Sequence, residues 1–295
     1  MINIKTRFSF SQFIFNIIFV ICSIACIIPV ITVLSVSFSN ESDIYQYGYR
    51  IIIKEFTTLA YEYLFKNPEQ IINSYLVTTF VSFVGMFLSL LVMSAMAYPL
   101  SRLDFRFRNK ISFFLFFTML FSGGMVPWYM VVSGLHINNT LLVLILPYLV
   151  NPWYIFLLRT FMQSISKEIV ESAYIDGARE WRIFLTIILP LSKPGLASVG
   201  IFVLLAYWND WWLAMMFITK DNLLPLQYLL ARIMANIQFL TENISNMPSG
   251  VNRSEIPGET IRMAVCVIAA GPMLFIFPFF QKYFTKGLTV GAIKG

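Results

Sequence analysis

A charged stretch and an aromatic stretch contain the residues whose types and spacing could support specific chemistry. The charged one is ESAYIDGAREWRIFLTIILP, residues 171–190, in a chain that is 58% hydrophobic and only 12% charged. The aromatic one is YWNDWW, residues 207–212. Neither pairs a nucleophile with a base, forms a glycine-rich phosphate loop or has metal-ligand spacing. Cys22, Cys26 and Cys266 lie in apolar stretches without such spacing. We therefore expect no catalytic site, no metal site and no cofactor on this chain.

The elements that must position these two stretches are membrane helices. The chain has 295 residues, of which 17% are aromatic, and its composition is typical of a polytopic membrane protein. Crossing about 30 Å of hydrocarbon takes about 20 apolar residues, and lipid leaves helix as the expected state. The sequence thus predicts an all-α membrane protein with six transmembrane helices at about 13–36, 73–99, 111–132, 140–160, 194–216 and 261–281.

The distribution of charge predicts the orientation of these helices. Most of the 21 Lys and Arg residues fall in segments on the same side as the N-terminus, while most acids fall on the other side. The positive-inside rule then places both termini in the cytoplasm. The net charge of +6 reflects this topology, and we expect no nucleic-acid partner. The first 36 residues begin like a signal peptide, but their apolar core is too long and no small-residue cleavage site follows, so we expect a retained first helix.

The charged stretch is predicted to form two short helices in a cytoplasmic loop. Ser166 is placed to cap the first helix, with Glu168 in its first turn. An apolar stripe recurs at three- and four-residue spacing, at Ile165, Ile169, Val170, Ala173 and Tyr174. Asp176-Gly177 marks a turn, and a second helix is expected from Glu180 to Pro190, with Pro194 opening the next span. From composition alone, such a pair could equally be a connector resting on lipid headgroups.

The spacing within the charged stretch resembles a known family signature. It resembles the E-A-A-x3-G-x9-I-x-L-P signature of ATP-binding-cassette importer permeases. The matching residues are Glu171-Ser172-Ala173, then Gly177 after three residues, Ile187 after nine more, and Leu189-Pro190 after one more, and Ser172 is the departure from the signature. In that family the loop forms a coupling helix that sits in a cleft on the ATPase subunit. The resemblance implies the type I importer permease fold, with coupling helices at about 163–193. The implied ATPase-coupling residues are Glu171, Ser172, Ala173, Asp176, Gly177, Ile187, Leu189 and Pro190.

The resemblance extends from about residue 70 to the end of the chain. Three stretches resemble second permease subunits of the maltose-type sugar uptake family, especially those that import complex or acidic oligosaccharides. They are SAMAYPLSRLDFRFRN at 94–109, GGMVPWYMVVSGLHINNTLLVLILP at 123–147 and QKYFTKGLTVGAIKG at 281–295. It implies a core at 71–281 after a first helix and outer loop at 1–70. It also implies a cytoplasmic tail at 282–295 that reaches the ATPase. The implied tail-coupling residues are Lys286, Gly287, Gly291 and Lys294.

The aromatic stretch is the candidate sugar path in this resemblance. Aromatic rings stack on the apolar faces of sugars, while Asn and Asp bind hydroxyl groups. The stretch ends about 22 Å along the fifth span, near the outer boundary, where tryptophans also form the aromatic belt of membrane proteins. Both interpretations stay open. The candidates for the path are Tyr207, Trp208, Asn209, Asp210 and Trp211. An outer segment at 220–260, with a helix in LQYLLARIMANIQFL, and the loop at 37–70 are candidate docking surfaces for an extracellular binding protein.

The resemblance implies a permease subunit of an ATP-driven oligosaccharide importer in the bacterial cytoplasmic membrane. Its implied partners are a second homologous permease, two ATP-binding-cassette ATPase subunits and an extracellular or lipid-anchored solute-binding protein. ATP and Mg²⁺ would be bound by the ATPase subunits. One alternative is a permease of the same class for a non-sugar solute, such as an amino acid or a phosphonate. Another is a self-sufficient secondary transporter, although the two halves of the chain show no internal repeat.

Overall fold

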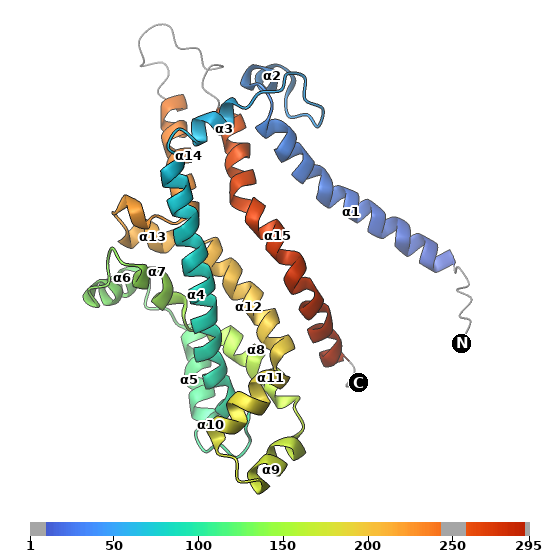
Figure 1. Ribbon diagram of the computed structural model, residues 1–295, viewed down its shortest axis with the longest axis vertical. Coiled ribbons are helices and arrows are strands. Elements are labelled where there is room, and N and C mark those ends of the chain that lie inside the picture. Colours follow the sequence, from blue (N-terminus) through green and yellow to red (C-terminus); the bar gives the residue numbers. More distant parts are fainter. Residues whose placement is uncertain (1–9, 243–257, 293–295) are drawn as a thin grey trace. The chain divides into compact units, whose positions relative to one another are not determined.

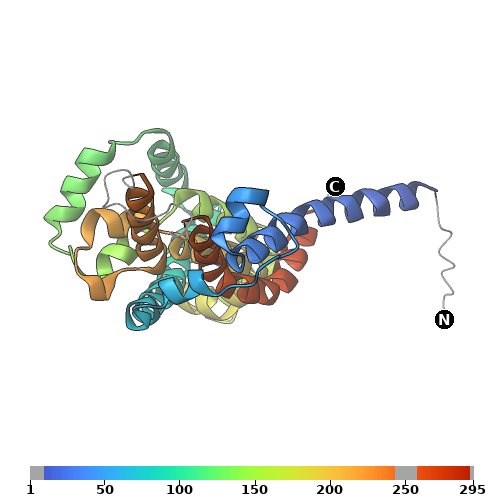
Figure 2. The same cartoon turned by 90° about the horizontal axis from the view of Figure 1, so that it is seen from above.

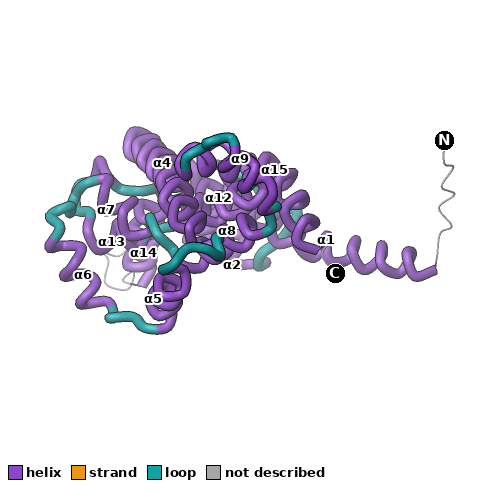
Figure 3. The backbone as a smooth tube through the Cα atoms, turned by 90° about the horizontal axis from the view of Figure 1, so that it is seen from below, coloured by secondary structure: helices purple, strands orange, loops and turns teal. Residues whose placement is uncertain are grey.

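The structure is a computed structural model that describes residues 10–242 and 258–292 (Figure 1). Every regular element in these residues is a helix (Figure 3), which confirms the all-α prediction. The helices are α1 (Phe10–Ser37), α2 (Glu41–Tyr47), α3 (Leu59–Leu64), α4 (Pro68–Ser101), α5 (Arg108–Leu120), α6 (Met125–Gly134), α7 (Leu141–Ile145), η1 (Leu146–Tyr148), α8 (Pro152–Gln163), α9 (Lys167–Ile175), α10 (Glu180–Ile183), η2 (Phe184–Ile188), α11 (Leu189–Leu191), α12 (Lys193–Trp208), α13 (Trp212–Phe217), η3 (Asp221–Leu223), α14 (Leu226–Glu242) and α15 (Gly258–Ala292).

The predicted spans correspond to helices of two kinds. Three helical stretches are long and apolar enough to cross a membrane by themselves, at Gln12–Ser37, Pro68–Ser101 and Gly258–Ile276. Three further candidates are bent pairs of helices, so the described residues hold up to six spans if each pair counts as one. The predicted helix at 220–260 is also present, as α14.

Two of the predicted spans are not continuous helices. The segment at 111–132 divides into α5 and α6, which are bent by 117°, and green α6 points away from α5 in Figure 2. Gly124, at the start of α6, has a φ of 85°, a conformation that side chains with a Cβ rarely adopt. The segment at 140–160 divides into Leu141–Tyr148 and α8, bent by 56°, because Pro152 must begin a new helix. The fifth span also ends early, since α12 stops at Trp208 and α13 follows separately.

The chain forms two compact units, and each is described by itself. One unit comprises Met1–Pro68 and Arg232–Gly271. Within it, the buried Glu41 carboxylate accepts hydrogen bonds from the backbone N–H groups of Glu259 (2.8 Å) and Thr260 (2.9 Å) and from the Thr260 hydroxyl (2.8 Å). These N–H groups belong to the first turn of α15 and have no partner within the helix. Glu41 therefore caps α15, and its negative charge is favourable at a helix N-terminus.

The second unit comprises Glu69–Ala231 and Pro272–Gly295, and α4 and α12 pack closely within it. Tyr207 is only 2% exposed, and its hydroxyl contacts Ser89 Oγ (3.0 Å) and donates to the Ile145 carbonyl (2.9 Å). Its ring lies against Gly85, where an added Cβ would come within 2.7 Å of the ring. The glycine lets the two helices approach at this point, as small residues do in membrane bundles.

This contact predicts that Gly85→Ala destabilises the protein. The added methyl group would force the Tyr207 ring and its two hydrogen bonds to shift, at a cost of about 1–3 kcal/mol. We expect the melting temperature of the detergent-purified protein to fall by several degrees. Gly134→Ala is the matched control, because a Cβ at Gly134 meets nothing within 4 Å. Equal melting temperatures for the two variants would contradict the proposed packing.

Candidate functional site

The charged stretch folds as predicted around its central turn. Helix α9 ends at Ile175, and Gly177 follows in the left-handed conformation with a φ of 76°. The Gly177 N–H donates to the Tyr174 carbonyl (2.9 Å), and the Ala178 N–H donates to the Ala173 carbonyl (2.9 Å). These two bonds define a Schellman motif, which satisfies carbonyl groups that the end of a helix leaves free. The left-handed conformation at position 177 therefore strongly favours glycine.

Two local details of the prediction were wrong. Ser166 precedes α9 as expected, but its hydroxyl donates to the Glu168 carboxylate and accepts no backbone N–H. The predicted second helix is also irregular: α10 gives way to the π-helical turn η2, and the three-residue α11 follows before α12 begins. The segments Glu180–Leu191 and Lys193–Trp208 are bent by 78°. Single π-helical turns inside helices are frequent at functional sites.

A polar cluster that the sequence analysis missed holds α9 and α10 to the end of α4. We call it the Arg102 cluster, and its members are Tyr98, Arg102, Asp104, Tyr174 and Glu180. Arg102 binds Asp104 through Nε (2.9 Å) and Nη2 (2.6 Å), and its Nη1 donates to the Tyr174 hydroxyl (2.7 Å). Tyr98 donates to Glu180 Oε2 (2.7 Å), and Tyr174 donates to Glu180 Oε1. The Arg102 guanidinium thus joins the α4–α5 loop to α9. The hydroxyl groups of Tyr98 and Tyr174 join α4 and α9 to Glu180 of α10.

The charges in the Arg102 cluster support this arrangement. The hydrogen bond from Arg102 lowers the pKa of the Asp104 carboxyl, so that group stays ionised. Burial, followed by the bond to Glu180, raises the pKa of the Tyr174 phenol, which therefore keeps the proton that it donates. Tyr98 also stacks on Phe184 at a ring distance of 5.4 Å. A signal existed in the sequence, since Arg102 and Asp104 lie in the stretch at 94–109 that resembles a family loop.

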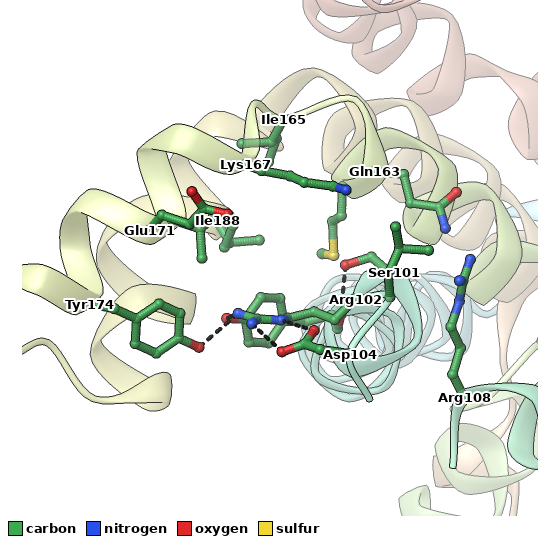
Figure 4. Close-up of a pocket in the computed structure, with 14 residues that line it drawn as sticks. Ser101, Arg102, Asp104, Arg108, Gln163, Ile165, Lys167, Glu171, Tyr174 and Ile188 are labelled. Carbon is green, nitrogen blue, oxygen red and sulfur yellow. Dashed lines mark hydrogen bonds and ion pairs between the residues drawn. The ribbon is translucent and has the colours of Figure 1, made fainter. Parts of the chain in front are cut away.

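Beside the cluster lies a cavity of about 620 Å³, between the end of α4 and α9 (Figure 4). Its lining includes Lys167, Glu171 and Tyr174 from α9, which follow one another at helical spacing on one face. Glu171 therefore lines this cavity and is itself exposed. Of the other implied coupling residues, Ala173 is buried, Ile187 and Leu189 pack against the core, and Ser172, Asp176, Gly177 and Pro190 are exposed.

The outward face of α9 carries an apolar residue that the sequence analysis did not single out. Ile175 is 87% exposed at the last position of the helix, next to the exposed Ser172 and Asp176. Its place at the tip of the α9–α10 loop makes Ile175 a candidate for a contact that a partner protein would bury. Periodicity assigns the apolar stripe to the core and gives no reason to expect an isoleucine outside it.

We expect Ile175→Asp to weaken the attachment of a cytoplasmic partner to this chain. Losing a buried aliphatic anchor and burying a charge would cost about 2–4 kcal/mol of binding free energy. The measurement is the amount of partner that co-purifies with the tagged chain. Ile52→Asp is the control, because Ile52 is 83% exposed but lies in the 37–70 loop, far along the chain from α9. Equal recovery of the partner with both variants would contradict a docking role for Ile175.

The aromatic stretch is divided between packing and exposed positions. Tyr207 and Trp208 are buried, so their side chains offer no surface to a solute in this conformation. Asn209 is exposed, and its amide donates to the Leu205 carbonyl (2.9 Å). Asp210 accepts from the Tyr148 hydroxyl (2.8 Å) and from the Leu213 N–H (3.3 Å), so it fixes the start of α13. Trp211 is exposed and lies edge-on to Trp212.

The implied tail residues lie in or beyond the last helix. The segment at 261–281 and most of the expected tail form one continuous helix, since α15 runs to Ala292. Lys286, Gly287 and Gly291 fall within this helix, and Lys294 lies outside the described residues.

The apolar helices, the bent pairs and the turn at Gly177 are those of a polytopic membrane protein, and comparison with known proteins identifies its family. Residues 75–290 match the family of binding-protein-dependent transport system inner membrane components, and the chain belongs to this family. It is therefore a multi-pass protein of the bacterial cytoplasmic membrane and not an enzyme in its own right.

Similar proteins and a similar solved structure are also transport-system components. The chain is 37% identical to the polygalacturonan/rhamnogalacturonan transport system permease protein YtcP of Bacillus subtilis, over 92% of this chain and 94% of that protein. It is also 37% identical to protein LplC of the same organism, over 91% and 90%. Among solved structures, it is similar to a chain of a bacterial ABC transporter involved in the import of the acidic polysaccharide alginate. That similarity has a TM-score of 0.78 at 27% identity and covers 94% of this chain and 99% of the other.

Proposed function

We propose that this chain is one of two permease subunits of an ATP-driven importer of oligosaccharides. The names of its relatives support a sugar: YtcP is named for polygalacturonan and rhamnogalacturonan, AraQ of Bacillus subtilis for arabinooligosaccharides, and the similar structure for alginate. Membership of a binding-protein-dependent family argues against a self-sufficient secondary transporter. The remaining partners are a second homologous permease, two ATP-binding-cassette ATPase subunits and an extracellular or lipid-anchored solute-binding protein.

The observation that carries the proposal is the turn at Gly177 with its outward face. A Schellman motif fixes the angle between α9 and α10, and the exposed Ile175 lies at the outer tip. The Arg102 cluster ties the same tip to α4, a helix of 34 residues. Motion of an ATPase subunit that grips the tip would therefore reach a membrane-spanning helix through short, charge-assisted contacts. In this account ATP and Mg²⁺ are bound by the ATPase subunits, and the chain itself contributes no catalytic group.

The same geometry supports the proposed orientation. The α9–α10 loop must lie in the cytoplasm to meet an ATPase, and α4 connects it to the opposite membrane surface. The positive-inside distribution of Lys and Arg gives the same orientation, with both termini in the cytoplasm.

Purification of the tagged chain from its own host tests the proposed function. We expect a second permease and an ATP-binding-cassette ATPase to co-purify. In proteoliposomes with the solute-binding protein, we expect ATP hydrolysis to be stimulated by at least one of trigalacturonate, arabinotriose and maltotriose. Stimulation by an amino acid or a phosphonate, with none by the three sugars, would make this a permease for a non-sugar solute. Purification without any ATPase would contradict the proposal as a whole.

A further inference from the structure

One hollow in the second unit is lined by residues that belong to, or lie next to, three interruptions of the helical backbone. They are the breaks at Phe121–Gly124, Leu149–Asn151 and Asn209–Trp211, between α5 and α6, between η1 and α8, and between α12 and α13. Helices α6, α7 and α13 lie close together in Figures 1 and 3, and the rings of Trp128 and Phe217 are 5.5 Å apart. The hollow has a volume of about 590 Å³, within the range of pockets that bind small ligands.

The interruptions lie at a depth where a membrane helix should have no free backbone groups. Helix α5 has 13 residues and starts after the α4–α5 loop, and α12 has 16 and starts after α11, so their far ends lie about 20–24 Å along the helix axes from these starts. That distance lies within the outer half of a hydrocarbon layer about 30 Å thick. Non-helical backbone at such depth is tolerated only where protein covers it or where it lines a water-filled space. Residues 121–124 are all exposed in this chain, so lipid is an unsuitable neighbour for them.

The lining of the hollow combines aromatic faces with a few polar groups and has no charged side chain. Trp128, Tyr148 and Trp212 supply the rings, and Ser122, Gly123 and Gly124 supply the polar rim. Ser122 Oγ accepts from the Gly124 N–H (3.2 Å), which leaves its own O–H free to donate. Tyr148 donates to Asp210, which leaves a lone pair on its hydroxyl to accept. One donor and one acceptor thus flank the rings.

The rings are held in place by contacts outside the hollow. Tyr148 is fixed by its bond to Asp210 and lies edge-on to Tyr207 at 5.9 Å. Trp212 begins α13, whose first turn is anchored because the Leu213 N–H donates to Asp210. Rings fixed in this way lose little conformational freedom when they bind a ligand.

We propose that this hollow is a saccharide-binding site on the transport path. A sugar ring of the transported oligosaccharide stacks on Trp212 and Trp128, and its hydroxyl groups pair with Ser122 and Tyr148. The proposal rests on the proposed function and assigns the sugar contact to residues other than Tyr207 and Trp208, which are buried. Asp210 acts here as a positioning residue, because its carboxylate holds Tyr148 and the start of α13.

The test uses the intact complex with its binding protein in proteoliposomes and measures the initial uptake rate of labelled trigalacturonate, or of arabinotriose or maltotriose if the wild-type complex carries that sugar faster. Loss of one stacking ring weakens the binding of a sugar by about fivefold to tenfold. We therefore expect Trp212→Ala to lower uptake by about that factor, and Trp212→Phe, which keeps a ring, to stay within about twofold of wild type. Trp153→Ala is the matched control, because Trp153 is exposed but does not line the hollow.

The outcomes separate the site from the proposed function. Wild-type uptake by Trp212→Ala would overturn the site, as would equal losses in Trp212→Phe and Trp212→Ala. A reduced yield of assembled complex for Trp212→Ala would also overturn it, because the face would then be a contact between subunits. If the wild-type complex carries none of the three sugars but is stimulated by an amino acid or a phosphonate, the proposed function fails together with the site.

Discussion

Gly177→Val is expected to abolish transport while the chain still inserts into the membrane. The residue has a φ of 76°, at which a β-branched side chain clashes with its own backbone. Nothing lies within 4 Å of a Cβ built at this position, so the strain comes from the backbone conformation alone and not from crowding. Relief of that strain would unwind the Schellman motif and change the direction in which α9 presents Ile175. The measurement is sugar uptake in cells beside the amount of chain in the membrane fraction.

Gly177→Asn is the control for this variant. Asparagine tolerates the left-handed conformation far better than valine and is the second most common residue at this position of a helix end. It should therefore retain a substantial part of wild-type uptake. If Gly177→Val transports normally with the ATPase attached, the turn is not the coupling element. If both variants fail equally, the glycine is needed for close approach of a partner and not for its conformation.

Arg102→Ala is expected to lower sugar uptake about tenfold and to leave ATP hydrolysis poorly coupled to it. The Arg102 side chain is mostly buried, and it is the single group that contacts Asp104 and Tyr174 together. Charge-assisted hydrogen bonds contribute about 1.5–3 kcal/mol, and partial exposure of Asp104 and Glu180 reduces that figure toward about 1 kcal/mol. Without these bonds, the polar link between α4 and α9 that remains runs through Glu180, which accepts from Tyr98 and from Tyr174. The measurement is the ratio of sugar transported to ATP hydrolysed in proteoliposomes.

Two further substitutions define what Arg102 contributes. Arg102→Lys keeps the charge but cannot bind Asp104 through two nitrogens while a third reaches Tyr174, so an intermediate ratio is expected. Arg106→Ala removes an exposed arginine of the same loop, and its ratio should match wild type. A wild-type ratio for Arg102→Ala would show that the contacts of Arg102 are not needed to transmit the motion.

The sequence predicted the helical elements better than their continuity. Long apolar runs such as 73–99 correspond to single helices, although this run contains Gly85 and Pro99. The runs at 111–132 and 140–160 are equally apolar, yet they break at Ser122–Gly124 and before Pro152. Hydropathy measures transfer into lipid and is insensitive to such breaks. Gly123-Gly124 and the Asn151-Pro152 pair were the available signals.

The turn at Gly177 was predictable because it depends on local chemistry, whereas the Arg102 cluster was not. Gly177 is required by the backbone of a single helix end, and its neighbours in sequence are its neighbours in space. Arg102 and Glu180 are far apart in the chain and meet only because α4, α9 and α10 converge. The YWNDWW stretch shows a related limit: composition indicated a sugar contact, but only tertiary packing separates the buried Tyr207 from Trp212 at the hollow.

Photocross-linking from position 175 tests the central claim most directly. A benzophenone amino acid replaces Ile175 in one variant and Ile52 in the other, both of them highly exposed in the chain. Irradiation of cells that contain the whole transport system should join the chain to its ATP-binding-cassette ATPase from position 175 and not from position 52. A cross-link to the ATPase from position 52, or none from position 175 in an assembled and active complex, would contradict the assignment of the α9–α10 loop as the site where ATP hydrolysis drives this permease.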